Sequence, residues 1–150
     1  MKKINVKELK KFSYELRKSI LISAKKSGGR GAHLGGTMSC VEILVYLYFS
    51  KVMKYFKNKP NHPLRDRFFI GKGHAHLALY HIWSKIGFLS KKKVDTYTQN
   101  GTKLSVQLDH FIPGSEYNTG SLGHVIGVGT GAALKAKIDK DRFKVFCLIG

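Results

Sequence analysis

The sequence predicts an α/β protein with a mostly parallel sheet and helices on both of its faces. Two short apolar runs, 67–70 and 143–149, have the composition of buried strands. The segments around them carry apolar residues three or four positions apart, which is the pattern of helices. Strands that alternate with helices favour a parallel sheet. Each run also ends at a glycine, on the sheet edge where such folds bind ligands.

The first predicted element is a helix over residues 6–26. An apolar residue recurs there at every third or fourth position, and two lysines close the pattern. A glycine-rich loop follows over 27–36 and ends the helix.

A second predicted helix covers residues 40–55. Ser39 and Glu42, three residues apart, have the spacing of a capping box at its start. The segment is apolar nearly all round, so we expect it to be buried. Two prolines within 57–63 then interrupt regular structure.

The middle of the chain has the order strand, basic glycine turn, helix. The strand 67–70 runs into Gly71–His74, and a helical pattern extends from residue 75 to about residue 87. This order is the setting in which α/β proteins bind anionic groups. A short polar helix is predicted near 90–98, and 100–118 is expected to be irregular.

Residues 119–133 read as a polar loop that turns directly into a helix. Gly123, Gly127 and Gly131 recur every fourth residue and would share one helix face. A glycine within a helix costs about 1 kcal/mol relative to alanine. We therefore expect another element or a ligand to approach this backbone closely, with tight helix packing as the simpler interpretation.

The formal net charge is +18, with 27 basic and 9 acidic residues among 150. Nucleic-acid sites favour arginine forks interleaved with aromatic residues, whereas 22 of the 27 basic residues here are lysines spread over several segments. A solvated lysine-rich surface is thus favoured over a nucleic-acid platform. Its field would still attract anions such as sugar phosphates.

The cysteine and hydropathy patterns indicate a cytoplasmic protein that does not span a membrane. Cys40 and Cys147 each lie within an apolar run and are expected to be buried and reduced. The N-terminus lacks the apolar core of a signal peptide, and no apolar run is long enough to cross a bilayer.

Seven histidines are present, and three of them, His33, His74 and His124, lie in glycine-bearing loops. A metal site built on His74, His76 and His81 is disfavoured, because their spacing is not the i, i+4 pair that clamps zinc and no carboxylate lies nearby. We therefore predict no histidine metal site.

Four stretches in order resemble the N-terminal, thiamin-diphosphate-binding segment of transketolases. The resemblance is strongest to the split type, whose two halves are separate polypeptides. It covers about residues 6–150. The stretches are His33–Leu44 (HLGGTMSCVEIL), Asp66–Ala75 (DRFFIGKGHA), Thr119–Gly123 (TGSLG) and Phe146–Gly150 (FCLIG).

The resemblance implies a thiamin-diphosphate-binding fold and a role for each matching residue. His33 would face the C1 hydroxyl and carbonyl of the substrate and assist proton transfer. His74 would lie beside the cofactor's diphosphate, where Lys72 adds positive charge. The backbone at Gly120 would meet the aminopyrimidine, and Leu122 would pack against its ring.

The same resemblance implies what else the active protein needs. His110 is the candidate for a third catalytic histidine, with a structural role as the alternative. Gly150 would be the first residue of a Gly-Asp-Gly motif, so the Mg²⁺ ligands are expected beyond it. Residues 1–150 would then be the N-terminal part of one cofactor domain.

Such a chain is expected to need the rest of that domain or a C-terminal transketolase subunit, and to be inactive alone. The expected assembly is a homo- or hetero-oligomer acting on a sugar or sugar phosphate. A non-catalytic module that binds sugar phosphate or protein is the alternative, with nucleic-acid binding less favoured.

Overall fold

The computed structural model describes residues 5–28 and 32–150. In chain order its elements are α1 (Val6–Lys26), α2 (Leu34–Met38), α3 (Val41–Phe49), β1 (Arg67–Ile70), the 3₁₀ turn η1 (Gly73–Ala75), α4 (His76–Lys85), α5 (Lys91–Val94), α6 (His124–Ile138) and β2 (Val145–Leu148).

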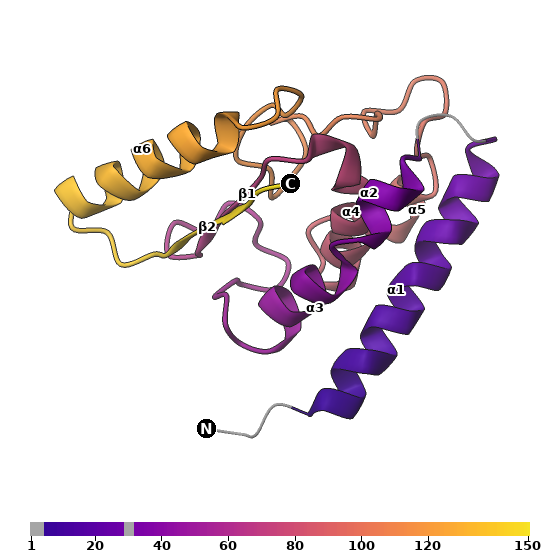
Figure 1. The fold of residues 1–150 in the computed structure, drawn as a ribbon, viewed down its shortest axis with the longest axis horizontal. Helices are drawn as coiled ribbons and strands as arrows, with labels where there is room; N and C mark the ends of the chain where they lie inside the picture. The colour runs from indigo at the N-terminus through magenta and orange to yellow at the C-terminus, as the bar shows by residue number, and fades with distance from the viewer. Residues whose placement is uncertain (1–4, 29–31) are drawn as a thin grey trace.

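The two strands pair in parallel, with Arg67 opposite Val145 and Ile70 opposite Leu148. Figure 1 shows α6 on one side of this sheet and the group of α1 to α5 on the other. The predicted α/β class with a parallel sheet covered on both faces is therefore confirmed.

The core lies between β1 and the helices α1, α3 and α4. The segment Leu77–Tyr80 of α4 is fully buried, and Ile20, Val41 and Leu44 reach it from α1 and α3. Trp83 donates its indole N–H to the Tyr48 hydroxyl at 3.0 Å, so even this polar atom is satisfied inside the core.

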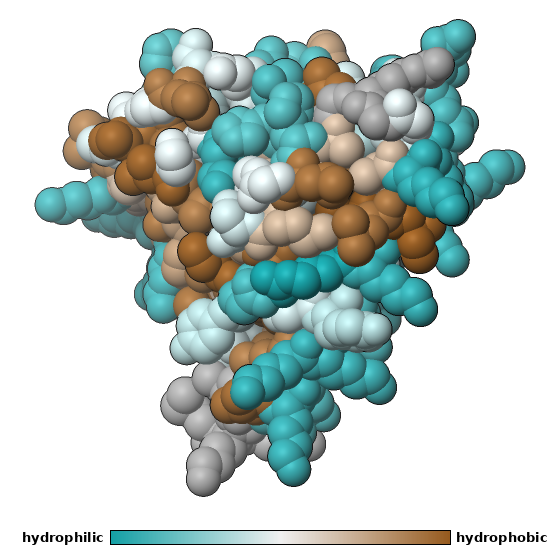
Figure 2. Space-filling model, turned by 45° about the vertical axis from the view of Figure 1, so that its right-hand side comes forward, coloured by the Kyte–Doolittle hydropathy of each residue, from teal (hydrophilic) through white to brown (hydrophobic). Residues whose placement is uncertain are grey.

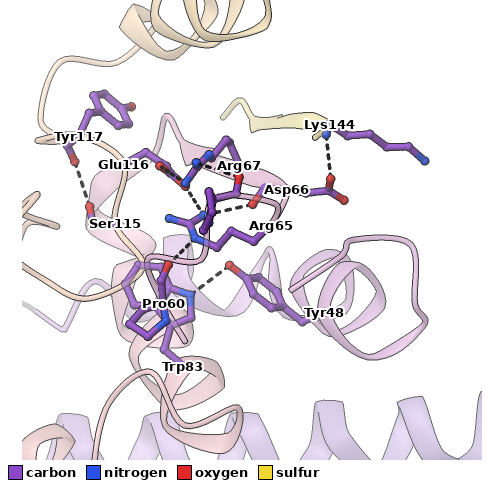
Figure 3. A network of polar contacts seen from close by, with 11 residues as sticks. Tyr48, Pro60, Arg65, Asp66, Arg67, Trp83, Ser115, Glu116, Tyr117 and Lys144 are labelled. Atoms are coloured by element: carbon purple, nitrogen blue, oxygen red, sulfur yellow. Dashed lines mark hydrogen bonds and ion pairs between the residues drawn. The ribbon is translucent and has the colours of Figure 1, made fainter. Parts of the chain in front are cut away.

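A buried polar network fixes the start of β1 (Figure 3). The Asp66 carboxylate accepts the backbone N–H groups of Lys54 and Lys144, each at 2.7 Å. The Arg65 guanidinium pairs with Glu116, and both side chains are almost completely buried. These contacts tie the chain before β1, the start of β2 and the irregular 100–118 region together.

The helix predicted over 40–55 is shorter than expected and is not buried all round. Helix α3 ends at Phe49, and its Ile43 and Tyr46 side chains are about half exposed. The predicted capping box is also wrong. The Ser39 hydroxyl donates to the Gly36 carbonyl at 3.0 Å, and Glu42 pairs with Arg17 on α1, because a charged partner attracts a carboxylate more strongly than a backbone N–H does.

The strand expected to be buried over 143–149 is also shorter and more open. Strand β2 covers only Val145–Leu148, and Cys147 is exposed although it faces α6. Among the described residues β2 pairs with β1 alone, so its other edge is left uncovered, although the Cys147 sulfur packs against the backbone of Gly129. Cys40 is buried, as predicted.

The helix expected near 90–98 is limited to α5, a single turn whose N-cap residue is Ser90. The Ser90 hydroxyl accepts the N–H of Lys93 at 3.2 Å and so caps this turn. Residues 100–118 contain no helix or strand, as expected.

Candidate functional site

His33 and His74 are 41 positions apart in sequence but come together beyond the end of β1. Their ring centroids are 5.7 Å apart. His33 is the N-cap residue of α2 and has left-handed backbone torsions, with φ at 36°. His74 lies in η1, the turn that follows β1. The structure thus places two of the three predicted catalytic histidines side by side.

Gly36 of α2 makes this approach possible. A Cβ added to Gly36 would lie 2.5 Å from Cδ2 and 2.7 Å from Nε2 of the His74 ring. Neighbouring Gly35 has nothing within 4 Å of the same position. The second glycine of the Gly35-Gly36 pair is therefore the one that accommodates His74.

The loop before α6 packs against the other side of the same turn. A Cβ on Gly73 would overlap the Thr119 hydroxyl oxygen, so only glycine allows this contact. Thr119 is held in turn by Leu108, whose backbone N–H donates to that oxygen at 3.0 Å. The turn carrying His74 therefore contacts both α2 and the loop that leads to Gly120.

The predicted cofactor-binding residues Gly120 and Leu122 are accessible. Gly120 has φ at 145°, a torsion that favours glycine, and nothing lies within 4 Å of its Cβ position. Leu122 is 60% exposed. An open backbone next to an uncovered apolar side chain has the character needed to receive a flat heteroaromatic ring.

No described element of this chain approaches the period-four glycines of α6 closely, so the approach of a ligand or partner to them stays a prediction. Gly123 precedes the helix, with φ at 87°, and both Gly127 and Gly131 have open space at their Cβ positions. The glycine that does pack is Gly129, whose Cβ position overlaps the Cys147 sulfur. Gly127 and Gly131 lie on the outer face of α6, and the strands pack against the opposite face.

His110 does not join the histidine pair. Its backbone N–H donates to the Asn118 side-chain oxygen at 2.8 Å, and its Nδ1 lies 2.7 Å from the same oxygen. Its ring packs on Phe111, with the two ring centroids 3.8 Å apart. Through Asn118 it is attached to the loop that carries Thr119 and Gly120.

Lys72 gives this end of the sheet its positive charge. Its Nζ donates to the Ser39 hydroxyl at 2.7 Å, and its side chain contacts Gly150, at the end of β2. Burial lowers the pKa of His74, and the neighbouring His33 and Lys72 lower it further. His74 is therefore a neutral hydrogen-bonding group beside a fixed cation near neutral pH.

Sequence patterns did not reveal the supporting roles of Ser39, Thr119 and Asn118. Each acts through a contact with a residue outside its own motif: Lys72, Leu108 and His110 respectively. The sequence marks Thr119 only as part of the loop motif, and nothing in its local surroundings indicates what its hydroxyl binds.

The described part of the chain offers neither a metal centre nor a membrane span. Among residues 5–28 and 32–150, no group of three or more His, Cys, Asp or Glu side chains is arranged to hold a metal ion. His81 bonds Ser23 at 3.0 Å, and His76 is buried, so neither joins His74 in a ligand set. No helix in the same ranges is both long and apolar enough to cross a bilayer.

The residues present fit thiamin diphosphate in two respects. The open backbone of Gly120 and the exposed Leu122 suit a ring, and Lys72 suits an anionic diphosphate. Within the described ranges, no cluster of carboxylate ligands for a divalent metal ion accompanies these residues.

Comparison with known proteins identifies the family of this chain. Residues 18–145 match the family "Transketolase, thiamine diphosphate binding domain". One of the subunits of the apulose-4-phosphate transketolase of Phocaeicola vulgatus is 41% identical over 81% of the chain, which spans 43% of that protein. Human transketolase is 37% identical over 86% of the chain, which spans 20% of it.

A solved structure supports the same relationship at the level of the fold. Transketolase from Leishmania mexicana superposes with a TM-score of 0.73 and 26% identity, covering 84% of this chain and 19% of that one. The chain thus spans less than half the length of these relatives. By its motifs, its fold and its matched residues, this chain belongs to the transketolase family, within the thiamine diphosphate binding domain.

Proposed function

We propose that this chain is the N-terminal part of a transketolase that uses thiamin diphosphate to move a two-carbon ketol unit from a ketose, or its phosphate, to an aldose or its phosphate. The observation that carries the proposal is the approach of His33 to His74 at 5.7 Å, beside the open backbone of Gly120. Bound thiamin diphosphate would supply the carbanion that cleaves the ketose carbon–carbon bond.

The chain's own residues would bind and orient the reactants. His74 and Lys72 would contact the diphosphate, Gly120 and Leu122 the aminopyrimidine, and His33 the substrate hydroxyl whose proton moves. His110 would enter the site only if its loop shifted away from Asn118, so we give it the smaller role of fixing that loop. Gly150 would begin the segment whose following residues hold Mg²⁺.

A partner is part of the proposal. The relative from Phocaeicola vulgatus is named as one subunit of its enzyme and is longer than this chain, so residues 1–150 would complete the cofactor site together with further chain and a C-terminal partner. The outer face of α6 supports such an assembly. Gly127, Gly131, Leu134 and Ile138 lie along it, and both large side chains are more than half exposed.

Figure 2 shows that apolar atoms gather at the upper left of the view, on the side where Figure 1 places α6. A partner that covered this face would remove it from water. The lack of side chains at the two glycines also leaves room for another backbone to approach closely.

Calorimetric titration of thiamin diphosphate with Mg²⁺ tests the function. We expect binding by the complete protein together with its C-terminal partner, and weak or no binding by residues 1–150 alone. Absence of binding in every folded form would contradict the proposal and favour the non-catalytic alternative.

Two substitutions test the division of roles in that complex. His74→Ala should weaken cofactor binding about tenfold or more, because it removes a diphosphate contact, whereas His33→Ala should mainly lower turnover. Equal loss of cofactor affinity in both variants would contradict these assignments.

A further inference from the structure

His76 lies next to the candidate site, on the side of the core, and is completely buried. It is the first residue of α4, two positions after His74. Its ring packs against Tyr80 and Tyr97, with centroids 5.0 and 5.8 Å away. It therefore stands between the rigid aromatic core and the turn that carries His74.

Within the described ranges the ring of His76 makes one hydrogen bond, and that bond fixes its tautomer. Nδ1 bonds the carbonyl oxygen of Gly73, the first residue of η1. A carbonyl can only accept, so Nδ1 carries the proton and Nε2 is the bare acceptor. The backbone N–H of His76 donates to the same carbonyl, so one residue holds Gly73 by two bonds.

The burial of the other ring nitrogen, Nε2, does not stabilise the fold. His76 Nε2 is buried without a hydrogen-bond partner among the described residues, and so is the Tyr80 hydroxyl. Burying an unpaired polar atom is unfavourable, and an apolar residue of similar size would avoid it. The Nδ1 bond to Gly73 is the feature that such a residue could not reproduce.

The turn held by His76 is the structural centre of the candidate site. Gly73 contacts Thr119, the Thr37 hydroxyl donates to the His74 carbonyl at 3.4 Å, and the His74 ring lies over Gly36. A shift of Gly73 would therefore move His74 relative to α2 and to the Gly120 loop together.

We propose that His76 is a positioning residue, whose Nδ1–H bond to the Gly73 carbonyl sets the turn that holds His74 against His33. It touches neither substrate nor cofactor. The effect on cofactor binding rests on the proposed function, whereas the effect on His74 does not.

Three variants separate this role from simple packing. The amide of His76→Asn can donate from near the place of Nδ1, the amide of His76→Gln extends toward the place of Nε2, and His76→Leu has no donor. In the complete protein without cofactor, NMR should show wild-type His76 as the Nδ1–H tautomer. The His74 ring signals should move in His76→Leu and His76→Gln and return toward wild type in His76→Asn.

Cofactor affinity and stability are measured on the same variants in the complex with the partner. We expect about tenfold weaker thiamin diphosphate binding in His76→Leu, with an unchanged or higher resistance to urea, and recovery to within about threefold in His76→Asn. A merely structural residue would lower resistance to urea and leave the affinity of the folded fraction unchanged.

Unmoved His74 signals in His76→Leu would overturn the proposal. If His76→Leu does not fold, equal His74 signals in His76→Asn and His76→Gln would overturn it. Moved His74 signals in a protein that binds no cofactor in any form would leave the positioning role standing and contradict the proposed function instead.

Discussion

At the scale of single residues, the site depends on glycines that face particular side chains. Gly36 and Gly35 are neighbours in α2, but only Gly36 lies under the His74 ring. A methyl group there would push the ring aside, because 2.5 Å is well inside van der Waals contact.

Gly36→Ala is therefore expected to weaken thiamin diphosphate binding about tenfold or more while changing the free energy of unfolding little, since a ring can rotate away. Calorimetry and urea unfolding measure the two effects. Gly35→Ala is the matched control, with open space at its Cβ, and should bind as wild type and be more stable by up to about 1 kcal/mol. Equal binding by both variants would show that His74 is not held over Gly36.

At the scale of elements, a buried ion pair between Arg65 and Glu116 attaches the 100–118 region to the chain before β1. The side chains of Arg65 and Glu116 are 6% and 12% exposed, whereas those of the surface pair Lys26 and Asp95 are 55% and 44% exposed. Removing one partner of a buried pair leaves an uncompensated charge, and exposed pairs are screened by water.

Glu116→Gln should therefore lower the free energy of unfolding by about 3 kcal/mol, because Arg65 stays buried without its anion. Asp95→Asn should lower it by less than about 1 kcal/mol. Denaturant titration of both variants compares them directly. A similar small loss in each would mean that Arg65 finds sufficient compensation in its carbonyl partners, Pro60 and Asp66.

The helix α6 gives a second test at this scale. Gly127→Ala and Gly131→Ala should each stabilise the isolated chain by up to about 1 kcal/mol, because the added methyl meets open space and a helical glycine is replaced. Gly129→Ala should destabilise it through a clash with Cys147.

Thermal unfolding followed by circular dichroism measures these changes. If a partner covers the outer face, the two stabilising substitutions should weaken its association, and sedimentation of the mixed subunits would show that loss. Unchanged association would remove this face from the proposed assembly.

At the scale of the whole molecule, the fully buried His76 and the partly buried His81 make stability depend on pH. Burial lowers the pKa of His76 and of His81 from 6.5 to about 4. In the unfolded chain both titrate near 6.5, so below that pH the unfolded state takes up protons that the folded state excludes. Their contribution is complete above about pH 6.5 and is lost as the pH falls toward 4.

The urea midpoint should therefore fall steadily between about pH 7 and pH 5. His81→Gln should flatten this dependence, since it removes one of the two groups, whereas exposed His124→Gln should not change it. A wild-type midpoint that stays constant over this range would contradict the exclusion of protons from both rings.

The sequence by itself determined the α/β class, the bounds of α1, the approximate positions of the strands and the four motifs of the transketolase family. Those features are local: they follow from the period of apolar residues and from short runs of glycine and histidine. The parallel orientation of the sheet was also expected from the alternation of elements.

Only the tertiary structure decided which residues meet. It brought His33 to His74, placed Gly36 rather than Gly35 beneath the ring, kept His110 on Asn118, and turned Gly127 and Gly131 outward. Each outcome depends on how separate segments pack together. A periodic pattern shows which residues share a face but not what covers that face. The same reason explains why Cys147 and the exposed side of α3 could not be predicted from their apolar surroundings.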